Sequence, residues 1–358
     1  MSRASRAASA AVVAASLLLA VGPVAAHEEY VVDGERDAGV EYLLDALTEP
    51  AVVGPLAVGA VVAGGAVVAY LALRPFPRDV AAFRSAMAEY REYVPWLLRI
   101  SFGIPLIGAG FGGYFVSPAV EADPRLLQIG LGFLLLFGLA TRLVAVATLA
   151  AYLVGLAVEP ALALQLEFVG GTAAIALLGG GRPSADHVLG RMAGAPGTVY
   201  GRVDPVYDRM RAFRGRVRSY ERFAPTVARV GLGATFVYLG VGQKLLRPGL
   251  ALAVVENYDL TAVVPVAPEL WVLGAGLTEA GLGLALVVGA FTRASAATAI
   301  ATFSLTLFAL PDDPVLAHVS LFGMASMLLI TGAGPYSIDA RLASAEEEAR
   351  TDAPRATA

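Results

Sequence analysis

Two long apolar segments of the sequence are nearly the same, and each ends in a threonine followed by an arginine. Residues 128–142 read QIGLGFLLLFGLATR, and residues 279–293 read EAGLGLALVVGAFTR. The similarity extends outward on both sides, with glycines, prolines, arginines and aspartates paired at matching spacings. Self-similarity of this kind means that one structural unit is used more than once. The sequence therefore predicts a tandem duplication, with residues 95–186 as the first copy and residues 225–342 as the second.

The composition places this unit in a membrane. Hydrophobic residues make up 57% of the 358 residues and charged residues only 16%, which a water-soluble chain of this length could not hide from solvent. The sequence contains no cysteine, so thiolate metal sites, iron–sulfur clusters and cysteine nucleophiles are excluded. We expect an all-α membrane protein without a metal site, built as two tandem parallel four-helix transmembrane bundles plus one N-terminal transmembrane helix.

The order of spans can be read from the N-terminus. Residues 1–26 carry two arginines, an apolar run and small residues before a charged stretch, as in a cleaved signal peptide; an uncleaved anchor is the alternative. Residues 27–50 then form an acidic extracytoplasmic segment, and residues 51–73 are long enough to cross a bilayer as a helix. Eight further spans are predicted, at residues 95–116, 126–140, 143–158, 161–180, 225–246, 269–290, 294–310 and 315–331.

The arginines predict the orientation. They fall almost entirely on one side of these spans if the mature N-terminus lies outside, and basic residues of short loops stay in the cytoplasm. We therefore expect a multi-pass protein of the cell membrane with a cytoplasmic C-terminus. Because each copy has an even number of spans, both copies insert in the same sense.

Three segments outside the spans have compositions that predict their structure. Residues 79–94 and the basic residues 187–224 are predicted to form amphipathic helices on the cytoplasmic leaflet, or linker helices that pack on the bundle. Since the positive-inside rule accounts for their arginines, no nucleic-acid partner is expected; the bilayer itself is the predicted partner. Residues 343–358 are predicted to be a disordered tail.

Glu279 is the strongest candidate for chemistry, because a charged group inside a bilayer is costly. It lies about ten residues into its span, near the midplane at about 1.5 Å of rise per residue, on the same helix face as Gly276 and Gly283. Such a small-residue face packs on neighbouring helices. Glu279 is expected to point into the bundle, either to exchange a proton or as a structural carboxyl bonded between helices. Gln128 takes its place in the first copy, and Glu167 is a second intramembrane carboxylate.

Four further polar residues of the second copy are candidates. Lys244, on one helical stripe with Arg229, is expected either to reach the outer interface or to contact an anion or a quinone headgroup. His318 is either a proton carrier near the outer surface or a hydrogen-bonded structural residue, and alone it cannot supply a bis-histidine haem. Arg293 is expected to cluster with Arg229 and Asp339 at the cytoplasmic rim and fix the helix order, or to act only as a topology signal.

The order of these motifs resembles the DoxX family of four-helix membrane proteins, whose relatives include the DoxD subunit of thiosulfate:quinone oxidoreductases. The residues that carry the resemblance are Arg229, Gly240 and Lys244, then Glu279, Gly289, Thr292 and Arg293, then His318 and the run GAGPYSID at residues 332–339. It covers residues 225–342 well and the first copy more loosely, where Gln128 and Tyr114 depart from the pattern. The resemblance implies a membrane subunit near quinone-linked electron transfer, with a separate partner subunit that holds the redox centres.

The first hypothesis is a quinone-interacting subunit of an oxidoreductase. In it Glu279 exchanges a proton, Lys244 or His318 contacts the headgroup, and Arg229 with Arg293 stabilises the inner end. The second hypothesis is a proton-coupled transporter of small solutes with Glu279 as the coupling site. The third is an assembly or scaffold protein without turnover.

Overall fold

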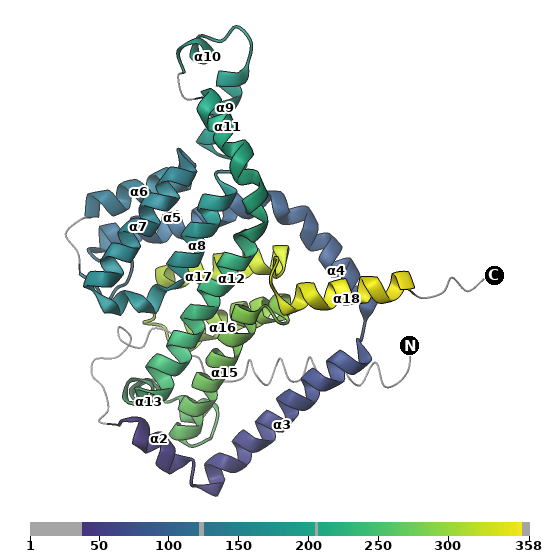
Figure 1. Cartoon of the computed structure of the whole chain (residues 1–358). Coiled ribbons are helices and arrows are strands. Elements are labelled where there is room, and N and C mark those ends of the chain that lie inside the picture. The colour runs from purple at the N-terminus through teal and green to yellow at the C-terminus, as the bar shows by residue number, and fades with distance from the viewer. Residues whose placement is uncertain (1–37, 122–124, 205–206, 353–358) are drawn as a thin grey trace.

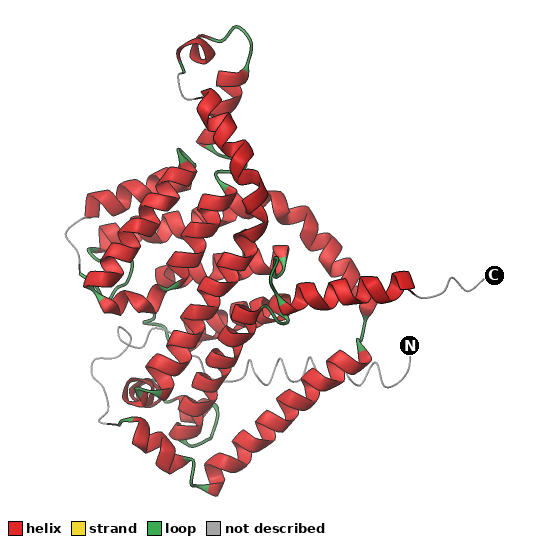
Figure 2. Ribbon diagram, in the orientation of Figure 1, coloured by secondary structure: helices red, strands yellow, loops and turns green. Residues whose placement is uncertain are grey.

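Every regular element in the described part of the chain is a helix (Figure 2). The structure is a computed structural model, and it describes residues 38–121, 125–204 and 207–352. The predicted signal peptide and the first part of the acidic segment lie outside these residues. The first part of the chain comprises α2 (Val40–Ala46), α3 (Pro50–Leu73), α4 (Pro77–Glu89), the 3-10 helix η2 (Tyr90–Tyr93), α5 (Val94–Gly112), α6 (Arg125–Phe137), α7 (Thr141–Val158), the 3-10 helix η3 (Pro160–Gln165) and α8 (Glu167–Leu178).

The remaining elements complete the chain (Figure 1). The connecting segment comprises α9 (Ala185–Gly194), α10 (Val199–Val203), α11 (Tyr207–Val217) and the 3-10 helix η4 (Arg218–Phe223). The last part comprises α12 (Ala224–Val237), the π-helix η5 (Tyr238–Leu245), α13 (Pro248–Asn257), α14 (Leu260–Val263), α15 (Pro268–Val288), α16 (Thr292–Ala309), α17 (Val315–Thr331) and α18 (Ile338–Asp352).

The apolar helices have the length that a bilayer requires. Among the described residues, five helical stretches are long and apolar enough to span a membrane: Pro50–Leu73, Pro77–Gly112, Thr141–Val158, Tyr207–Leu245 and Pro268–Val288. The shorter apolar helices α6, α8 and α17 lie among them in the bundle. An all-α membrane protein, as predicted, is confirmed.

The two four-helix blocks interlock. The first block is α5 to α8, and the second is α12 with α15, α16 and α17. Helix α8 packs along α12, and α17 packs along α5. Gly170 on α8 faces Gly231 on α12 so closely that a Cβ at Gly170 would lie 2.8 Å from the Gly231 Cα, and Gly323 on α17 faces Ser101 on α5 in the same way. Small residues allow this approach. One hydrophobic core therefore runs through both blocks.

Matching contacts recur in the two blocks, which run in the same sense. Asp186 accepts hydrogen bonds from two backbone N–H groups at the start of α7, and Asp339 does the same at the start of α16. Arg142 at the start of α7 pairs with Glu221, which lies just before α12. The starts of α7 and α12 therefore lie at one end of the molecule, called here the Arg-rich end. These matched contacts favour a tandem duplication, which stays a prediction.

Two short elements and α3 surround the second block. Helix α2 and helix α13 form a hydrophobic cluster with the start of α15, and Leu43 of α2 is buried in it. Helix α3 is mostly exposed and contacts α15. A cavity of about 290 Å³ lies between α3, α15 and α16, and small and apolar side chains from Ala63 to Tyr70 and from Leu277 to Ala285 line most of it.

Two predictions for the segments outside the spans need correction. Residues 187–224 do not form one linker helix, because Pro196 and Gly197 interrupt it; α9 to α11 form a hairpin that projects from the end at which α12 begins (Figure 1). Residues 343–352 belong to α18 and not to a disordered tail, because alanine and glutamate favour a helix; residues 353–358 lie outside the described part. Residues 79–94 form α4 and η2, and α4 contacts α17 without burying a residue.

Candidate functional site

A buried ion pair between Lys244 and Glu279 lies at the centre of the candidate site. The Lys244 Nζ donates to Glu279 Oε2 at 2.8 Å, and each residue is 1% exposed. Glu279 points into the bundle, as predicted. The expectation that Lys244 reaches the outer interface is wrong, because the carboxylate of α15 provides a charge partner inside the protein. Within the described residues, Glu279 is bonded to this lysine and not to a serine, a threonine or a carbonyl.

Glycines on both helices bring the two side chains together. Gly240 in η5 packs against the α15 backbone, where a Cβ would lie 2.6 Å from both the Gly276 carbonyl oxygen and the Ala280 nitrogen. Gly283 on α15 packs against Gly233 on α12 in the same manner. Because these glycines allow the backbones to approach, side chains that project from the same faces meet in the space between the helices.

The segment that carries Lys244 is a π-helix, which the sequence pattern did not predict. Residues Tyr238–Leu245 form this wider helix, and π-turns inside helices are frequent at functional sites. The predicted stripe from Arg229 to Lys244 nevertheless faces α15 along its length: Arg229 donates to the Leu286 carbonyl oxygen, Gly233 and Gly240 pack on the α15 backbone, and Lys244 bonds Glu279.

A second buried pair lies between Asp313 and His318. Asp313 Oδ2 lies 3.4 Å from His318 Nε2, and the histidine Nδ1 lies 3.3 Å from the Pro314 carbonyl oxygen. The two residues are 3% and 0% exposed. His318 is therefore buried within the protein. Asp313, in the turn between α16 and α17, was missed by sequence analysis, and the run Pro311 to Pro314, with its two acids between prolines, was the available signal.

The Asp313 carboxyl is electrostatically linked to the first pair. Burial raises the pKa of Asp313 to about 8, and the nearby Lys244 ammonium acts in the opposite direction. Lys244 is therefore close enough to influence both acids. We call Lys244, Glu279, Asp313 and His318 together the polar cluster.

The turn that holds Asp313 is tied to the short helices of the second block. The Tyr258 hydroxyl, just after α13, donates to Asp312 Oδ2 at 3.0 Å. Burial and this contact with Asp312 raise the pKa of Tyr258 to about 12. The α13 segment thus helps to fix the turn that carries the acid of the polar cluster.

Glu167 forms a separate polar contact between the two blocks. At the start of α8 it accepts hydrogen bonds from Ser320 on α17 at 2.9 Å and from Thr235 on α12 at 3.2 Å, and it is fully buried. Its counterpart by the matched glycine spacing is Ser320 itself. The structure therefore places this carboxyl at the junction of α8, α12 and α17, hydrogen-bonded to neutral side chains and not to the polar cluster.

The arginines at the Arg-rich end bind backbone carbonyls. Arg229 donates to the carbonyl oxygens of Ala333 and Leu286 at 3.0 Å each, and also to those of Val287 and Tyr336. Arg293 donates to the Leu329 and Ile330 carbonyl oxygens at 2.9 Å each. Both arginines thus hold the ends of α15 and α17, and Asp339 caps α16 nearby. Arg229 and Arg293 lie at the opposite end of α12 and α15 from Lys244, so the structure does not bring them into the polar cluster.

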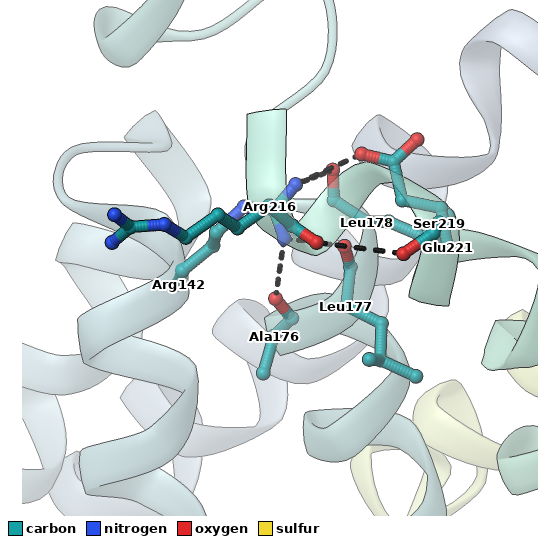
Figure 3. Close-up of polar contacts among 7 residues, drawn as sticks. All are labelled: Arg142, Ala176, Leu177, Leu178, Arg216, Ser219 and Glu221. Atoms are coloured by element: carbon teal, nitrogen blue, oxygen red, sulfur yellow. Dashed lines mark hydrogen bonds and ion pairs between the residues drawn. The ribbon is translucent and has the colours of Figure 1, made fainter. Parts of the chain in front are cut away.

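The first block has the corresponding arrangement (Figure 3). Arg142 donates to the carbonyl oxygens of Ala176 at 3.1 Å, Leu177 at 2.6 Å and Leu178 at 3.3 Å, which are the last residues of α8. Its remaining contact is the 3.0 Å ion pair with Glu221. Carbonyls at a helix C-terminus lack partners within the helix and carry partial negative charge, so a guanidinium stabilises that end.

Among the described residues of the first block there is no equivalent of the Lys244–Glu279 pair. Gln128, in the position of Glu279, donates to the Tyr114 carbonyl oxygen and accepts from the Val116 N–H, both at 3.1 Å. An amide satisfied by the backbone holds a loop in place and carries no proton to exchange. The candidate chemistry is therefore confined to the second block.

Comparison with known proteins supports the resemblance seen in the sequence. Residues 224–312 match the family model described as DoxX, a segment that begins with α12 and includes Lys244 and Glu279. No curated protein and no solved structure matched the chain. The matched segment carries the buried ion pair, so this part of the chain is similar to the DoxX family of membrane proteins.

Proposed function

We propose that the chain is a membrane subunit associated with quinone-linked electron transfer, and that the polar cluster exchanges protons. The observation that carries the proposal is the 2.8 Å contact between Lys244 and Glu279 in side chains that are 1% exposed. Burying such an ion pair costs desolvation free energy that can exceed the attraction between the charges, so the pair is not explained by a gain in stability. The second acid and the imidazole beside this pair are additional titratable groups, and they favour a role in proton exchange over a purely structural role.

The cluster has acceptors that the protein leaves unsatisfied. Glu279 Oε1 and both Asp313 carboxyl oxygens are buried and accept no hydrogen bond from the described residues. Such atoms are costly to leave without a partner, and they can take one from a bound molecule or from a proton. Asp313, with a pKa of about 8, changes its protonation state close to neutral pH, as a group that takes up and releases protons should.

The donor groups of the cluster support a quinone headgroup as the ligand. Lys244 carries an ammonium with three N–H donors and His318 an imidazole, so each can donate to a carbonyl oxygen. When bound, a quinone supplies two-electron and two-proton redox chemistry. In this proposal Lys244 and His318 orient the headgroup, while Glu279 and Asp313 hold the protons that move.

The chain would depend on a partner subunit for electrons. With no cysteine and three histidines in the whole sequence, it has no thiolate ligands for an iron–sulfur cluster. We also propose that the protein lies in the cell membrane with the Arg-rich end toward the cytoplasm, because the positive-inside rule favours that orientation. The polar cluster then lies toward the opposite side of the bilayer.

Quinone retention by purified variants tests the proposal. The full chain is extracted with its native lipids, and bound quinone is quantified for wild type, Glu279→Gln and Lys244→Gln. Glu269→Gln is the matched control, since it makes the same chemical change on the same helix outside the cluster, where Glu269 accepts a hydrogen bond from Tyr42. We expect at least a fivefold loss of quinone in both cluster variants and retention in the control, with thermal stability measured in parallel.

Two other outcomes would replace the proposal. If no variant holds quinone but the wild type drives solute uptake into liposomes under a pH gradient, and Glu279→Gln abolishes that uptake, the transporter is the correct function. If neither activity is present and both cluster variants lose stability, the ion pair is structural.

A further inference from the structure

A cleft of about 740 Å³ lies at the Arg-rich end of the first block. The end of α8, the start of α7 and the hairpin of α9 to α11 enclose it. Its charged lining residues are Arg142, Arg182, Arg211, Arg214, Asp186, Asp204 and Glu221. The volume lies in the range typical of small-molecule sites, and the cleft lies at the opposite end of the bundle from the polar cluster.

The three acids of the cleft are already bonded within the protein. Asp186 accepts from the Ala140 and Thr141 N–H groups at 2.7 and 2.9 Å, and Glu221 pairs with Arg142 at 3.0 Å. Asp204 accepts from a backbone N–H at the start of α11 at 3.1 Å. The carboxylates are therefore bonded to groups of the protein itself.

Three of the arginines remain available. Arg182, Arg211 and Arg214 are exposed, and within the described residues none of their side chains makes a hydrogen bond or an ion pair. Arg214 reaches across the hairpin toward Gly190, where a Cβ would lie 3.9 Å from its Nη2. The guanidinium groups therefore come to the cleft from two different segments of the chain.

The histidine in the cleft responds to this positive charge. Desolvation lowers the pKa of His187, and the charges of Arg182, Arg191 and Arg214 lower it further. A cation is thus disfavoured where the cleft opens between α9 and α11, and an anion is favoured.

We propose that this cleft binds a phosphate group. Guanidinium groups match the geometry of phosphate oxygens and bind them through two hydrogen bonds at a time. Tyr200 and Tyr207 also line the cleft and offer hydroxyl donors. The cleft lies where the spans end, so the phosphate can belong to a lipid headgroup or to a soluble phosphoester. The chemistry of recognition is the same for both sources.

Isothermal titration of the full chain in a neutral detergent tests this site. The probes are inorganic phosphate and dihexanoyl phosphatidic acid, each at one ionic strength. The cleft variant is Arg182→Gln/Arg211→Gln/Arg214→Gln. The control is Arg209→Gln/Arg216→Gln/Arg218→Gln, which removes the same charge from exposed residues of the same region that do not line the cleft. We expect the cleft variant to bind at least tenfold more weakly and the control within about threefold of wild type.

The histidine provides a second readout. Because a bound phosphate offsets the arginine charges, the pKa of His187, followed by NMR, should rise when the probe is added. Saturation by both probes indicates a soluble phosphoester site, and saturation by the lipid alone indicates a headgroup site. Equal weakening in both triple variants, or no shift of His187 on binding, would overturn the proposal. The quinone test uses variants at Glu279 and Lys244, which lie outside the cleft, so either proposal can fail without the other.

Discussion

Replacing Lys244 by methionine tests how strongly charge holds the buried pair. At the observed 2.8 Å separation, an effective dielectric constant of about 20 gives an attraction of roughly 6 kcal/mol between the two charges. Removal of the cation leaves the Glu279 carboxylate buried without it, and such losses typically cost about 3–5 kcal/mol. The single variant Glu279→Leu leaves the Lys244 ammonium buried without its 2.8 Å partner and should be destabilising as well.

The double variant separates the pair from its surroundings. Lys244→Met/Glu279→Leu replaces both charges by apolar side chains of similar size, which is often neutral or stabilising. We expect the free energy of unfolding of the double variant to lie within about 1 kcal/mol of the wild-type value. The coupling energy between the two positions is then at least about 3 kcal/mol.

The measurement is a titration with SDS in mixed micelles, followed by the fluorescence of the buried Trp271. The control cycle uses Arg142→Met and Glu221→Leu, where the side chains are 13% and 35% exposed and the coupling should stay below about 1 kcal/mol. Additive single variants at Lys244 and Glu279, within about 0.5 kcal/mol, would refute a charge-held pair.

Three further predictions concern stability. The pKa of Asp313 is about 8 in the folded protein, above its ordinary value, so the folded state binds the proton more tightly than the unfolded state. The free energy of unfolding should therefore fall as the pH rises toward about 8. In unfolding titrations between about pH 5 and 9, Asp313→Asn should flatten this slope. Gly170→Leu should cost about 1–3 kcal/mol because its Cβ would lie 2.6 Å from a backbone oxygen of α12, whereas Gly130→Leu, with nothing within 4 Å, should be tolerated; equal effects would contradict the close helix contact. Asp339→Ala and Asp186→Ala should each lower the free energy of unfolding by about 1–2 kcal/mol through loss of a helix cap, and a large difference between them would argue against matched geometry in the two blocks.

Local properties of the chain account for the predictions that held. The length and hydropathy of a segment decide whether it can cross a bilayer as a helix, so the helical spans could be placed without knowledge of their neighbours. Gly276 and Gly283 around Glu279 showed which face of the helix would be packed, because residues three and four apart share a face. Glu279 is accordingly buried. The motif that ends in Thr292 and Arg293 likewise supported the DoxX resemblance.

The erroneous predictions came from segments where local signals compete. The tail at residues 343–352 is polar and acidic, but its alanines and glutamates also favour a helix, and α18 extends through it. The connecting segment at residues 187–224 has an amphipathic pattern, yet Pro196 and Gly197 divide it into a hairpin. In both segments the overall composition or periodicity did not predict the secondary structure that forms.

The partner of each polar group depends on how the helices are rotated and how closely they approach. Lys244 and Glu279 are 35 positions apart, and only the packing of η5 on α15 brings the ammonium to the carboxylate. Asp313 enters the polar cluster because the turn between α16 and α17 folds inward, and Glu167 is satisfied because α8 packs on a helix of the other block. Spans and buried faces follow from the free energy of transferring each segment into lipid, which adjacent residues determine; contacts between distant residues follow from the simultaneous packing of all the helices, which no single segment encodes.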